Sequence, residues 1–311
     1  MKRLIPLAAA LVVSACTSKE EADTSNGPIV STIGMISDVA GVIVGDKREV
    51  INIIGEATDP HGYVATKGDI DTVQSASLVL YNGHFLEGKM ATLLSERENA
   101  HAVAENLEGV ELLDGDEGHA DPHLWMDVSV WSKVAGNIGE QIIALDPENE
   151  ETYRKNLTTY QEELTLLNEY AIKALSSIPE KQRVLVTAHD AFSYLGRAYG
   201  IEVKGIQGIS TESAAGSKRI EELVTFFVDN KIPAIFVESS VSDKSVQAII
   251  EGAAAQGHTV TVGGELFSDA MGPAGTYEGT YLGMMDHNIT TIAKALGGSV
   301  PPKGFQNKLS H

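Results

Sequence analysis

Residues 147–179, PENEETYRKNLTTYQEELTLLNEYAIKALSSIP, contain no glycine and repeat apolar side chains at every third or fourth position. The repeating residues are Leu157, Tyr160, Leu164, Leu167 and Ala171. Side chains at this spacing share one face, which predicts an amphipathic helix over residues 147–178. Pro147 is acceptable in the first turn of such a helix, and Pro179 ends it. About 30 residues at 1.5 Å each give roughly 45 Å, which is longer than one domain needs, so we expect this helix to join two domains.

Strand and helix patterns alternate on both sides of this helix. Before it, the expected strands are residues 30–35, 50–54, 78–81 and 110–113, and the expected helices are 68–75, 86–98 and 128–145. After it, the expected strands are 184–187, 203–206, 234–237 and 259–262, and the expected helices are 192–199, 218–230, 244–256 and 281–296. Such alternation is typical of parallel sheets covered by helices. The sequence therefore predicts an α/β fold with two lobes, residues 28–146 and 179–311, each a mostly parallel sheet flanked by helices, joined by one long rigid helix at 147–178.

The first residues resemble a secretion signal. Lys2 and Arg3 precede an apolar run over residues 4–13 that is too short to span a bilayer. Val13-Ser14-Ala15-Cys16 resembles a bacterial lipobox, which implies cleavage after residue 15 and acylation of Cys16. The alternative is an ordinary signal peptide with an incidental cysteine. We expect a lipoprotein anchored to a membrane outside the cytoplasm, in the periplasm or at the cell surface, with a flexible tether over residues 16–27.

Composition limits the remaining possibilities. The chain has 311 residues, of which 43% are hydrophobic and 21% charged, as expected of a folded soluble protein. Its net charge of −20 makes it a poor binder of nucleic acid and favours cations near its surface. It has a single cysteine, the predicted anchor, so no internal disulfide or thiolate ligand is available. No P-loop, nucleophile elbow or His-Glu-x-x-His motif is present, and we expect no enzymatic activity.

Three histidines stand out by their context. His61 and His123 each end an Asp-Pro-His tripeptide, and His189 directly follows an expected strand. Proline stiffens the backbone before the two histidines, and ligands of open α/β sheets bind beyond the carboxyl ends of strands. The neighbouring carboxylates that could orient the rings are Asp59, Asp121 and Asp190. A single histidine is more often a hydrogen-bonded structural residue than a ligand, but the duplicated tripeptide favours a metal site.

These patterns do not decide the roles of Asp269 and His119. Asp269 follows an expected strand and the turn 263–268, and a helix-capping or turn role is the simpler interpretation. His119 lies in the acidic segment 114–121, which could take part in metal capture or be an ordinary solvated loop.

Several ordered blocks resemble a known family. They are Thr58–Tyr63, Leu80–Gly83, Ala120–Trp125, Thr187–Phe192, Gly205–Ser213, Phe236–Ser240 and Gly263–Asp269. The sequence resembles the metal-receptor subunits of bacterial ABC importers, the TroA-type receptors for manganese and zinc. The resemblance implies two α/β lobes on one rigid helix and a metal bound by His61, His123, His189 and Asp269, two from each lobe. Glu212 and Glu238 are candidates for supporting these ligands.

The resemblance leaves the metal open. Manganese receptors of the family commonly have Glu at the position of His189, and zinc receptors commonly have a long His-rich loop in place of segment 114–121. Three imidazoles and a carboxylate suit Zn²⁺, whereas Mn²⁺ prefers oxygen ligands and binds more weakly. We expect one ion of Zn²⁺ or Mn²⁺, with Fe²⁺ as a further candidate.

The resemblance also implies the partners. They are an ABC permease and, through it, the ATPase, and we expect a monomeric receptor. The alternatives are a surface adhesin, a receptor for a haem- or cobalamin-like ligand on a similar fold, and a metallohydrolase. Four protein ligands argue against the hydrolase, because a catalytic zinc keeps an open position.

Overall fold

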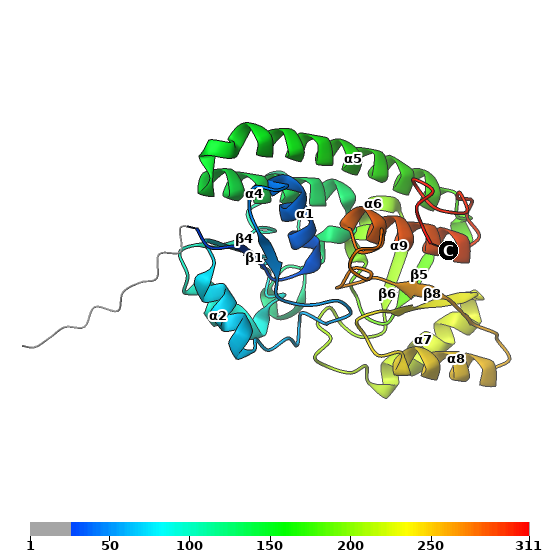
Figure 1. Ribbon diagram of the computed structural model, residues 1–311. Coiled ribbons are helices and arrows are strands. Elements are labelled where there is room, and N and C mark those ends of the chain that lie inside the picture. Colours follow the sequence, from blue (N-terminus) through cyan, green and yellow to red (C-terminus); the bar gives the residue numbers. More distant parts are fainter. Residues whose placement is uncertain (1–25, 311) are drawn as a thin grey trace, which may run out of the picture.

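The computed structural model describes residues 26–310 and shows two α/β lobes side by side under one long helix (Figure 1). This arrangement confirms the fold predicted from the sequence. The predicted signal peptide, Cys16 and most of the predicted tether lie outside the described residues.

The N-terminal lobe is built on a parallel sheet of four short strands in the order β2-β1-β3-β4. The strands are β1 (Ile29–Ser31), β2 (Val50–Asn52), β3 (Leu78–Tyr81) and β4 (Ala100–Ala102). Its helices are α1 (Gly34–Val44), α2 (Lys67–Ser75), α3 (Ala91–Ser95) and α4 (Val128–Leu145), with short 3-10 turns at Gly88–Met90, Asp116–Gly118 and Leu124–Met126. The central strand β1 is buried along its whole length, as expected of a parallel strand covered on both faces.

The C-terminal lobe contains two parallel strand pairs, β5-β6 and β7-β8, with β5 next to β7. The strands are β5 (Val184–Thr187), β6 (Glu202–Gly205), β7 (Ala234–Glu238) and β8 (Thr261–Leu266). The helices are α6 (Ser193–Tyr199), α7 (Ser217–Asn230), α8 (Lys244–Ala255) and α9 (Tyr281–Ala295), with a 3-10 turn at Glu180–Gln182. Helices α7 and α8 pack together on one side of the strands, and α9 and α6 lie on the side of the long helix (Figure 1).

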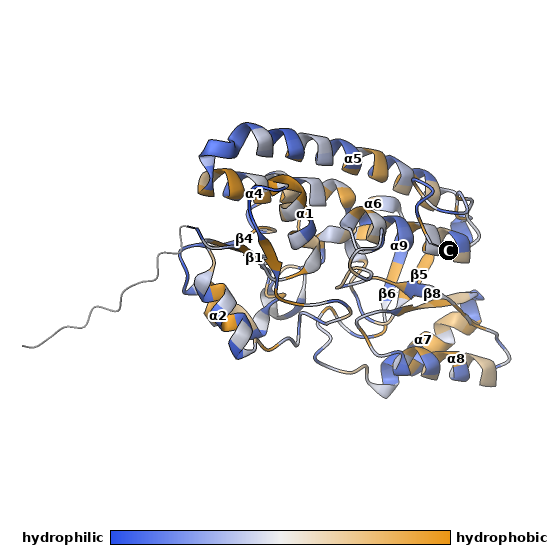
Figure 2. Ribbon diagram, in the orientation of Figure 1, coloured by the Kyte–Doolittle hydropathy of each residue, from blue (hydrophilic) through white to orange (hydrophobic). Residues whose placement is uncertain are grey.

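The long helix α5 (Glu150–Ser176) follows a 3-10 turn at Pro147–Asn149 and runs over both lobes. It contacts α1 and α4 of the N-terminal lobe and α6 and α9 of the C-terminal lobe. Its outer side is mostly hydrophilic (Figure 2), whereas the predicted apolar face is buried. No helix among residues 26–310 is long and apolar enough to cross a membrane.

The largest hydrophobic cluster lies under α5 and contains residues of both lobes. Trp131 of α4, Tyr160 of α5 and Tyr281 of α9 are all buried there, and the rings of Trp131 and Tyr281 stack with centroids 5.4 Å apart. Each lobe also has a smaller cluster between its strands and its outer helices. Because the main core is shared, the two lobes are not independent packing units near α5.

One sequence prediction in the N-terminal lobe is wrong, and another holds only in part. Residues 110–113 form no strand, and the fourth strand is β4. The backbone of this segment contacts the other lobe instead, because Leu113 N–H donates to the Tyr194 hydroxyl and Glu111 C=O accepts from Arg197. The helix expected at 86–98 is a 3-10 turn followed by the short α3.

Strand ends differ as well. The strand expected at 30–35 ends at Ser31, and helix α1 was missed although buried apolar residues recur along it at helical spacing. Strand β8 starts at Thr261 and continues to Leu266, through the two glycines interpreted as a turn. Gly263 is needed there, because a Cβ atom would lie 2.8 Å from the Phe236 ring of β7.

Candidate metal centre

Four side chains meet where the two lobes face each other. His61 lies in the loop after β2, and His123 immediately precedes the turn Leu124–Met126. His189 follows the end of β5, and Asp269 follows the end of β8. Each lobe thus contributes two side chains, and His61, His189 and Asp269 come from beyond the carboxyl ends of strands, where ligands of open α/β sheets bind. All four are buried, with exposed fractions of 6%, 0%, 0% and 2% in that order.

The polar atoms of these side chains point at one common position. One atom from each residue lies within 4.8 Å of the others. The Nε2 atoms of His61 and His123 are 3.3 Å apart. Asp269 Oδ1 lies 3.4 Å from His123 Nε2, and Asp269 Oδ2 lies 3.2 Å from His189 Nε2. Three imidazole nitrogens and both carboxylate oxygens therefore surround a small volume.

Several of these atoms have no hydrogen-bond partner among the described residues. They are both carboxylate oxygens of Asp269 and Nε2 of His189. A buried polar atom without a partner costs about 1–3 kcal/mol. A divalent cation bound between the four side chains would satisfy all of these atoms together, so the donor set fits a metal ion.

Asp121 orients His123. One oxygen of its carboxylate accepts from the backbone N–H of His123 at 3.0 Å and from the ring Nδ1 at 2.8 Å. This contact keeps a proton on Nδ1, so Nε2 is the ring nitrogen that faces the centre and would bind a metal. A carboxylate in this position fixes the tautomer and raises the basicity of the ligating nitrogen.

Glu238 plays the same part for His189 from the end of β7. It accepts from the backbone N–H of His189 at 2.9 Å and, through its other oxygen, from Nδ1. Asp59 supports His61 differently, because it accepts from the backbone N–H of His61 at 2.8 Å and not from the ring. The two Asp-Pro-His tripeptides are therefore not equivalent.

The buried carboxylates and imidazoles of the centre shift one another's pKa values. Burial lowers the pKa of His61 to about 4. Burial also acts to lower the pKa of His123, but Asp121 and Asp269 outweigh it and raise the value to about 9. In His189, Asp269 and Glu238 overcome burial and hold the pKa well above its usual range. The two imidazoles in turn hold the pKa of Asp269 well below its usual range against the effect of burial.

A cavity of about 320 Å³ opens from His61 toward the surface. Its walls include Phe85 and His119, whose rings stack with centroids 4.7 Å apart, and Glu212. Glu212 pairs with Lys89 of the other lobe at 2.6 Å. Hydrogen bonds also join the lobes at this mouth, from the Thr211 hydroxyl to Asp59 and from Ser210 N–H to Asp116.

The structure brings together the four residues predicted as ligands, but not every residue predicted to support them. His61, His123, His189 and Asp269 come together, and Asp59, Asp121 and Glu238 contact them. Asp190 instead accepts from the Ser193 hydroxyl at 2.7 Å, and Glu212 lies at the mouth. Sequence reasoning missed Thr211 and Lys89, since contacts between lobes leave no local pattern.

Comparison with known proteins identifies the family of this chain. A family model described as "ZnuA: Zinc-uptake complex component A periplasmic" matches residues 29–295. The chain belongs to this family. The resemblance inferred from the sequence blocks is thereby confirmed.

Known proteins of similar sequence match most of the chain. The manganese-binding lipoprotein MntA of Bacillus subtilis is 46% identical over 272 residues, which are 86% of this chain and 89% of the relative. The zinc-binding protein TroA of Treponema pallidum is 44% identical over 282 residues, 90% of this chain and 92% of the relative. The solved TroA structure matches with a TM-score of 0.84 and covers 87% of this chain and 99% of that chain. The Fe(III)-bound YtgA of Chlamydia trachomatis matches with a TM-score of 0.83 at 28% identity, covering 88% and 99%.

Proposed function

We propose that this protein is an extracytoplasmic solute-binding lipoprotein that captures one divalent transition metal ion and delivers it to an ABC permease. The observation that carries the proposal is the buried set of His61, His123, His189 and Asp269, whose ligand atoms lie within 4.8 Å of one another. The names of the relatives support it, because they describe manganese- and zinc-binding proteins and ABC transporter lipoproteins.

The cargo is Zn²⁺ or Mn²⁺. Three imidazole nitrogens and one carboxylate oxygen make a tetrahedral set that suits Zn²⁺. Both oxygens of Asp269 face the centre, and a fifth donor makes the site acceptable to Mn²⁺, which prefers oxygen ligands. The Fe(III)-bound YtgA structure keeps iron as a further candidate. Neither an adhesin nor a receptor for a haem- or cobalamin-like ligand is favoured by the relatives, whose names concern metals.

The receptor consists of the lobes 28–146 and 179–311 on either side of the linking helix 147–178. The contacts of α5 with helices of both lobes support this division. Cys16 is the lipid anchor, after removal of residues 1–15, and the permease is the partner that receives the metal. We expect the receptor to be a monomer without enzymatic activity.

Elemental analysis tests the proposal directly. Residues 28–311 are purified without added metal or chelator, bound elements are measured by mass spectrometry, and the apo protein is then titrated with Mn²⁺ and Zn²⁺ in competition. We expect about one ion per chain, and loss of binding in His61→Ala. His258→Ala is the matched control, because His258 precedes β8 at the end opposite Asp269 and its ring contacts Ile232 C=O. Absence of stoichiometric metal, or equal binding by both variants, would overturn the site.

The anchor is tested separately in the full chain. Cys16→Ser is expected to move the protein from the membrane fraction to the soluble extracytoplasmic fraction, since acylation of the thiol is lost. A Cys16→Ser protein that stays with the membrane would contradict the lipoprotein assignment without affecting the metal site.

A further inference from the structure

We propose that Trp125 is a positioning residue that fixes Asp269 relative to His123, and thereby decides whether the carboxylate offers one oxygen or two to the metal. The inference rests on the proposed metal-binding function. It concerns how the centre is held and which ion it favours.

Trp125 connects the two lobes at the centre itself. It is fully buried in the turn Leu124–Met126, two residues after His123. Its Nε1–H donates to the backbone C=O of Ser268, the residue before Asp269, at 2.8 Å. Its ring also makes a T-shaped contact with the His123 ring, with centroids 5.2 Å apart and planes at 70°. One side chain therefore contacts a ligand of its own lobe and the peptide next to a ligand of the other.

The carboxylate of Asp269 needs this support. Its oxygens lie 3.4 Å from His123 Nε2 and 3.2 Å from His189 Nε2, and neither has a hydrogen-bond partner among the described residues, so the backbone that carries the side chain helps to set its orientation. Phe267, two residues before Asp269, makes two hydrogen bonds to the Asn288 side chain. Its backbone N–H donates to Asn288 Oδ1 at 2.9 Å, and its C=O accepts from Asn288 Nδ2 at 2.7 Å. The Ser268 hydroxyl meets that of Ser240 at 3.0 Å. These anchors lie in the C-terminal lobe, whereas Trp125 comes from the N-terminal lobe.

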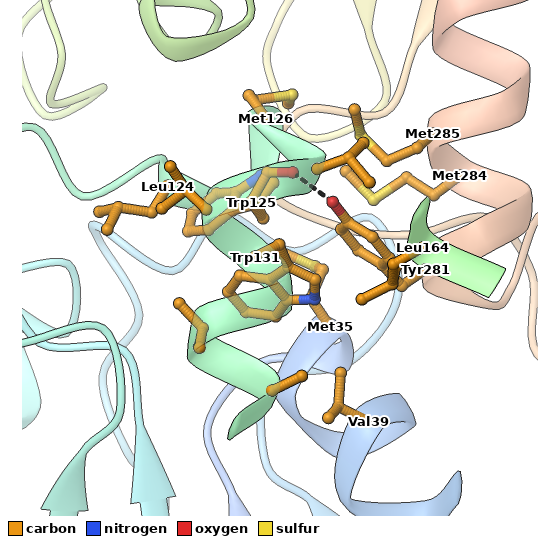
Figure 3. Close-up of a cluster of buried hydrophobic side chains, with 14 of the residues drawn as sticks. Met35, Val39, Leu124, Trp125, Met126, Trp131, Leu164, Tyr281, Met284 and Met285 are labelled. Carbon is orange, nitrogen blue, oxygen red and sulfur yellow. Dashed lines mark hydrogen bonds between the residues drawn. The ribbon is translucent and has the colours of Figure 1, made fainter. Parts of the chain in front are cut away.

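The backbone of Trp125 is held in turn. Its C=O accepts from the hydroxyl of Tyr281 at 2.7 Å, as Figure 3 shows. Tyr281 is the first residue of α9, and its backbone N–H donates to Asp38 of α1 at 3.0 Å. Trp125 is thus fixed through both its indole and its backbone.

The consequence for metal choice follows from coordination chemistry. Zn²⁺ is satisfied by four ligands, so it tolerates an Asp269 that offers a single oxygen. Mn²⁺ prefers oxygen donors and binds the same set more weakly, so the second oxygen matters more to it. Losing the Trp125 hydrogen bond should therefore weaken Mn²⁺ binding more than Zn²⁺ binding.

The experiment compares Trp125→Phe with Trp131→Phe. Both indoles are fully buried in the same cluster (Figure 3), and Nε1 of Trp131 has no hydrogen-bond partner among residues 26–310. Both changes shrink a buried ring, but only Trp125→Phe removes a hydrogen bond. The readouts are competition titrations with Mn²⁺ and Zn²⁺ and the visible absorption of the Co²⁺-loaded proteins, since four-coordinate Co²⁺ absorbs more strongly than five-coordinate Co²⁺.

We expect the Mn²⁺ affinity of Trp125→Phe to fall by about tenfold, the lower end of the loss typical when a partner that orients a ligand is removed, and the Zn²⁺ affinity to fall by less, so that the ratio of Mn²⁺ to Zn²⁺ affinity decreases. The Co²⁺ absorption should become more intense, while Trp131→Phe keeps the ratio and spectrum of the wild type. Tyr281→Phe, which keeps the indole and removes only the hydroxyl that holds Trp125 C=O, should shift both readouts in the same direction by less.

The outcomes separate the two proposals. A wild-type protein that binds none of the three ions overturns the metal-receptor function. A wild type that binds them, together with a Trp125→Phe protein whose ratio and spectrum match those of Trp131→Phe, overturns only the role of Trp125. If Trp125→Phe does not fold, Tyr281→Phe decides, and an unchanged ratio and spectrum in that variant reject the inference.

Discussion

Asp59 accepts a hydrogen bond from the hydroxyl of Thr211, which belongs to the opposite lobe. Its other oxygen accepts from the backbone N–H of His61 at 2.8 Å. A single carboxylate therefore links a proposed metal ligand to a loop that must move when the lobes separate. The Asp59–Thr211 contact lies at the mouth beside the Lys89–Glu212 ion pair.

This geometry predicts that Thr211→Val speeds metal release. Valine has nearly the shape of threonine but cannot donate to Asp59, and one hydrogen bond contributes about 1 kcal/mol, which corresponds to a factor of roughly five in rate. The dissociation rate is measured by stopped-flow transfer of Zn²⁺ to a coloured chelator. Thr225→Val is the control, because its hydroxyl bonds only within α7, to Glu221 C=O. Equal release rates in both variants would show that the contact does not hold the site closed.

Glu238 gives a second prediction, on affinity. Its two oxygens accept from the N–H and the Nδ1 of His189. In Glu238→Gln the amide oxygen can accept one of these bonds, but the amide nitrogen cannot accept the other. Loss of such support costs about 10–100-fold in metal affinity. Isothermal titration with Zn²⁺ and Mn²⁺ checks this, with Glu251→Gln on the exposed side of α8 as the control. An unchanged dissociation constant would mean that His189 is oriented by other contacts.

The sequence predicts much of this centre and little of what surrounds it. The Asp-Pro-His tripeptides and the strand-end histidine are local patterns, and the apolar repeat of residues 157–171 predicts α5. Asp269 follows a strand and is ambiguous alone, because a capping role explains an isolated aspartate equally well. It required the family resemblance.

Contacts between lobes could not be predicted, for a physical reason. The hydrogen bond from the Trp125 indole to Ser268 C=O joins residues 143 positions apart in the chain. The sequence around either residue does not specify its partner. The same holds for residues 110–113, whose apolar pattern predicts a strand although their backbone contacts Tyr194 and Arg197 instead. Helix α1 is different, because its buried residues recur at helical spacing and could have been recognised.

Asp38 leads to a prediction on pH. Burial raises the pKa of this carboxyl to about 6, and the hydrogen bond from Tyr281 N–H only partly opposes the shift. Because the folded-state pKa exceeds the ordinary value of 3.8, the folded protein holds the proton more tightly than the unfolded chain. The contribution to stability is therefore complete below about pH 4 and is lost as the pH rises through about 6.

Asp38→Asn should remove this dependence, since the amide oxygen can still accept from Tyr281 N–H and carries no charge. We expect the variant to gain roughly 2 kcal/mol over the wild type between pH 4 and 7. Urea unfolding of the metal-free protein across this range measures it. Asp71→Asn, an exposed carboxylate paired with Lys67, controls for loss of a negative charge. A wild type and an Asp38→Asn protein with parallel pH profiles would contradict the prediction.

The last prediction concerns how far the lobes separate. Helix α5 is hydrogen-bonded to both lobes, through Gln161 to Ser132 C=O of α4 at 3.1 Å and through Tyr170 to Thr290 of α9 at 2.7 Å. A continuous helix has no hinge, and the core beneath it is shared by the two lobes. We therefore expect small-angle scattering profiles of the metal-free and metal-loaded wild type to differ only modestly.

A local softening of α5 should enlarge that difference. Thr165 and Leu166 are exposed and lie between the two anchoring contacts. Replacing both by glycine destabilises the helix there by about 1 kcal/mol per residue relative to alanine. The double alanine variant is the matched control, because it removes the same side chains and keeps the helix stiff. A wide opening of the metal-free wild type, or equal profiles for the glycine and alanine variants, would show that α5 does not limit the movement of the lobes.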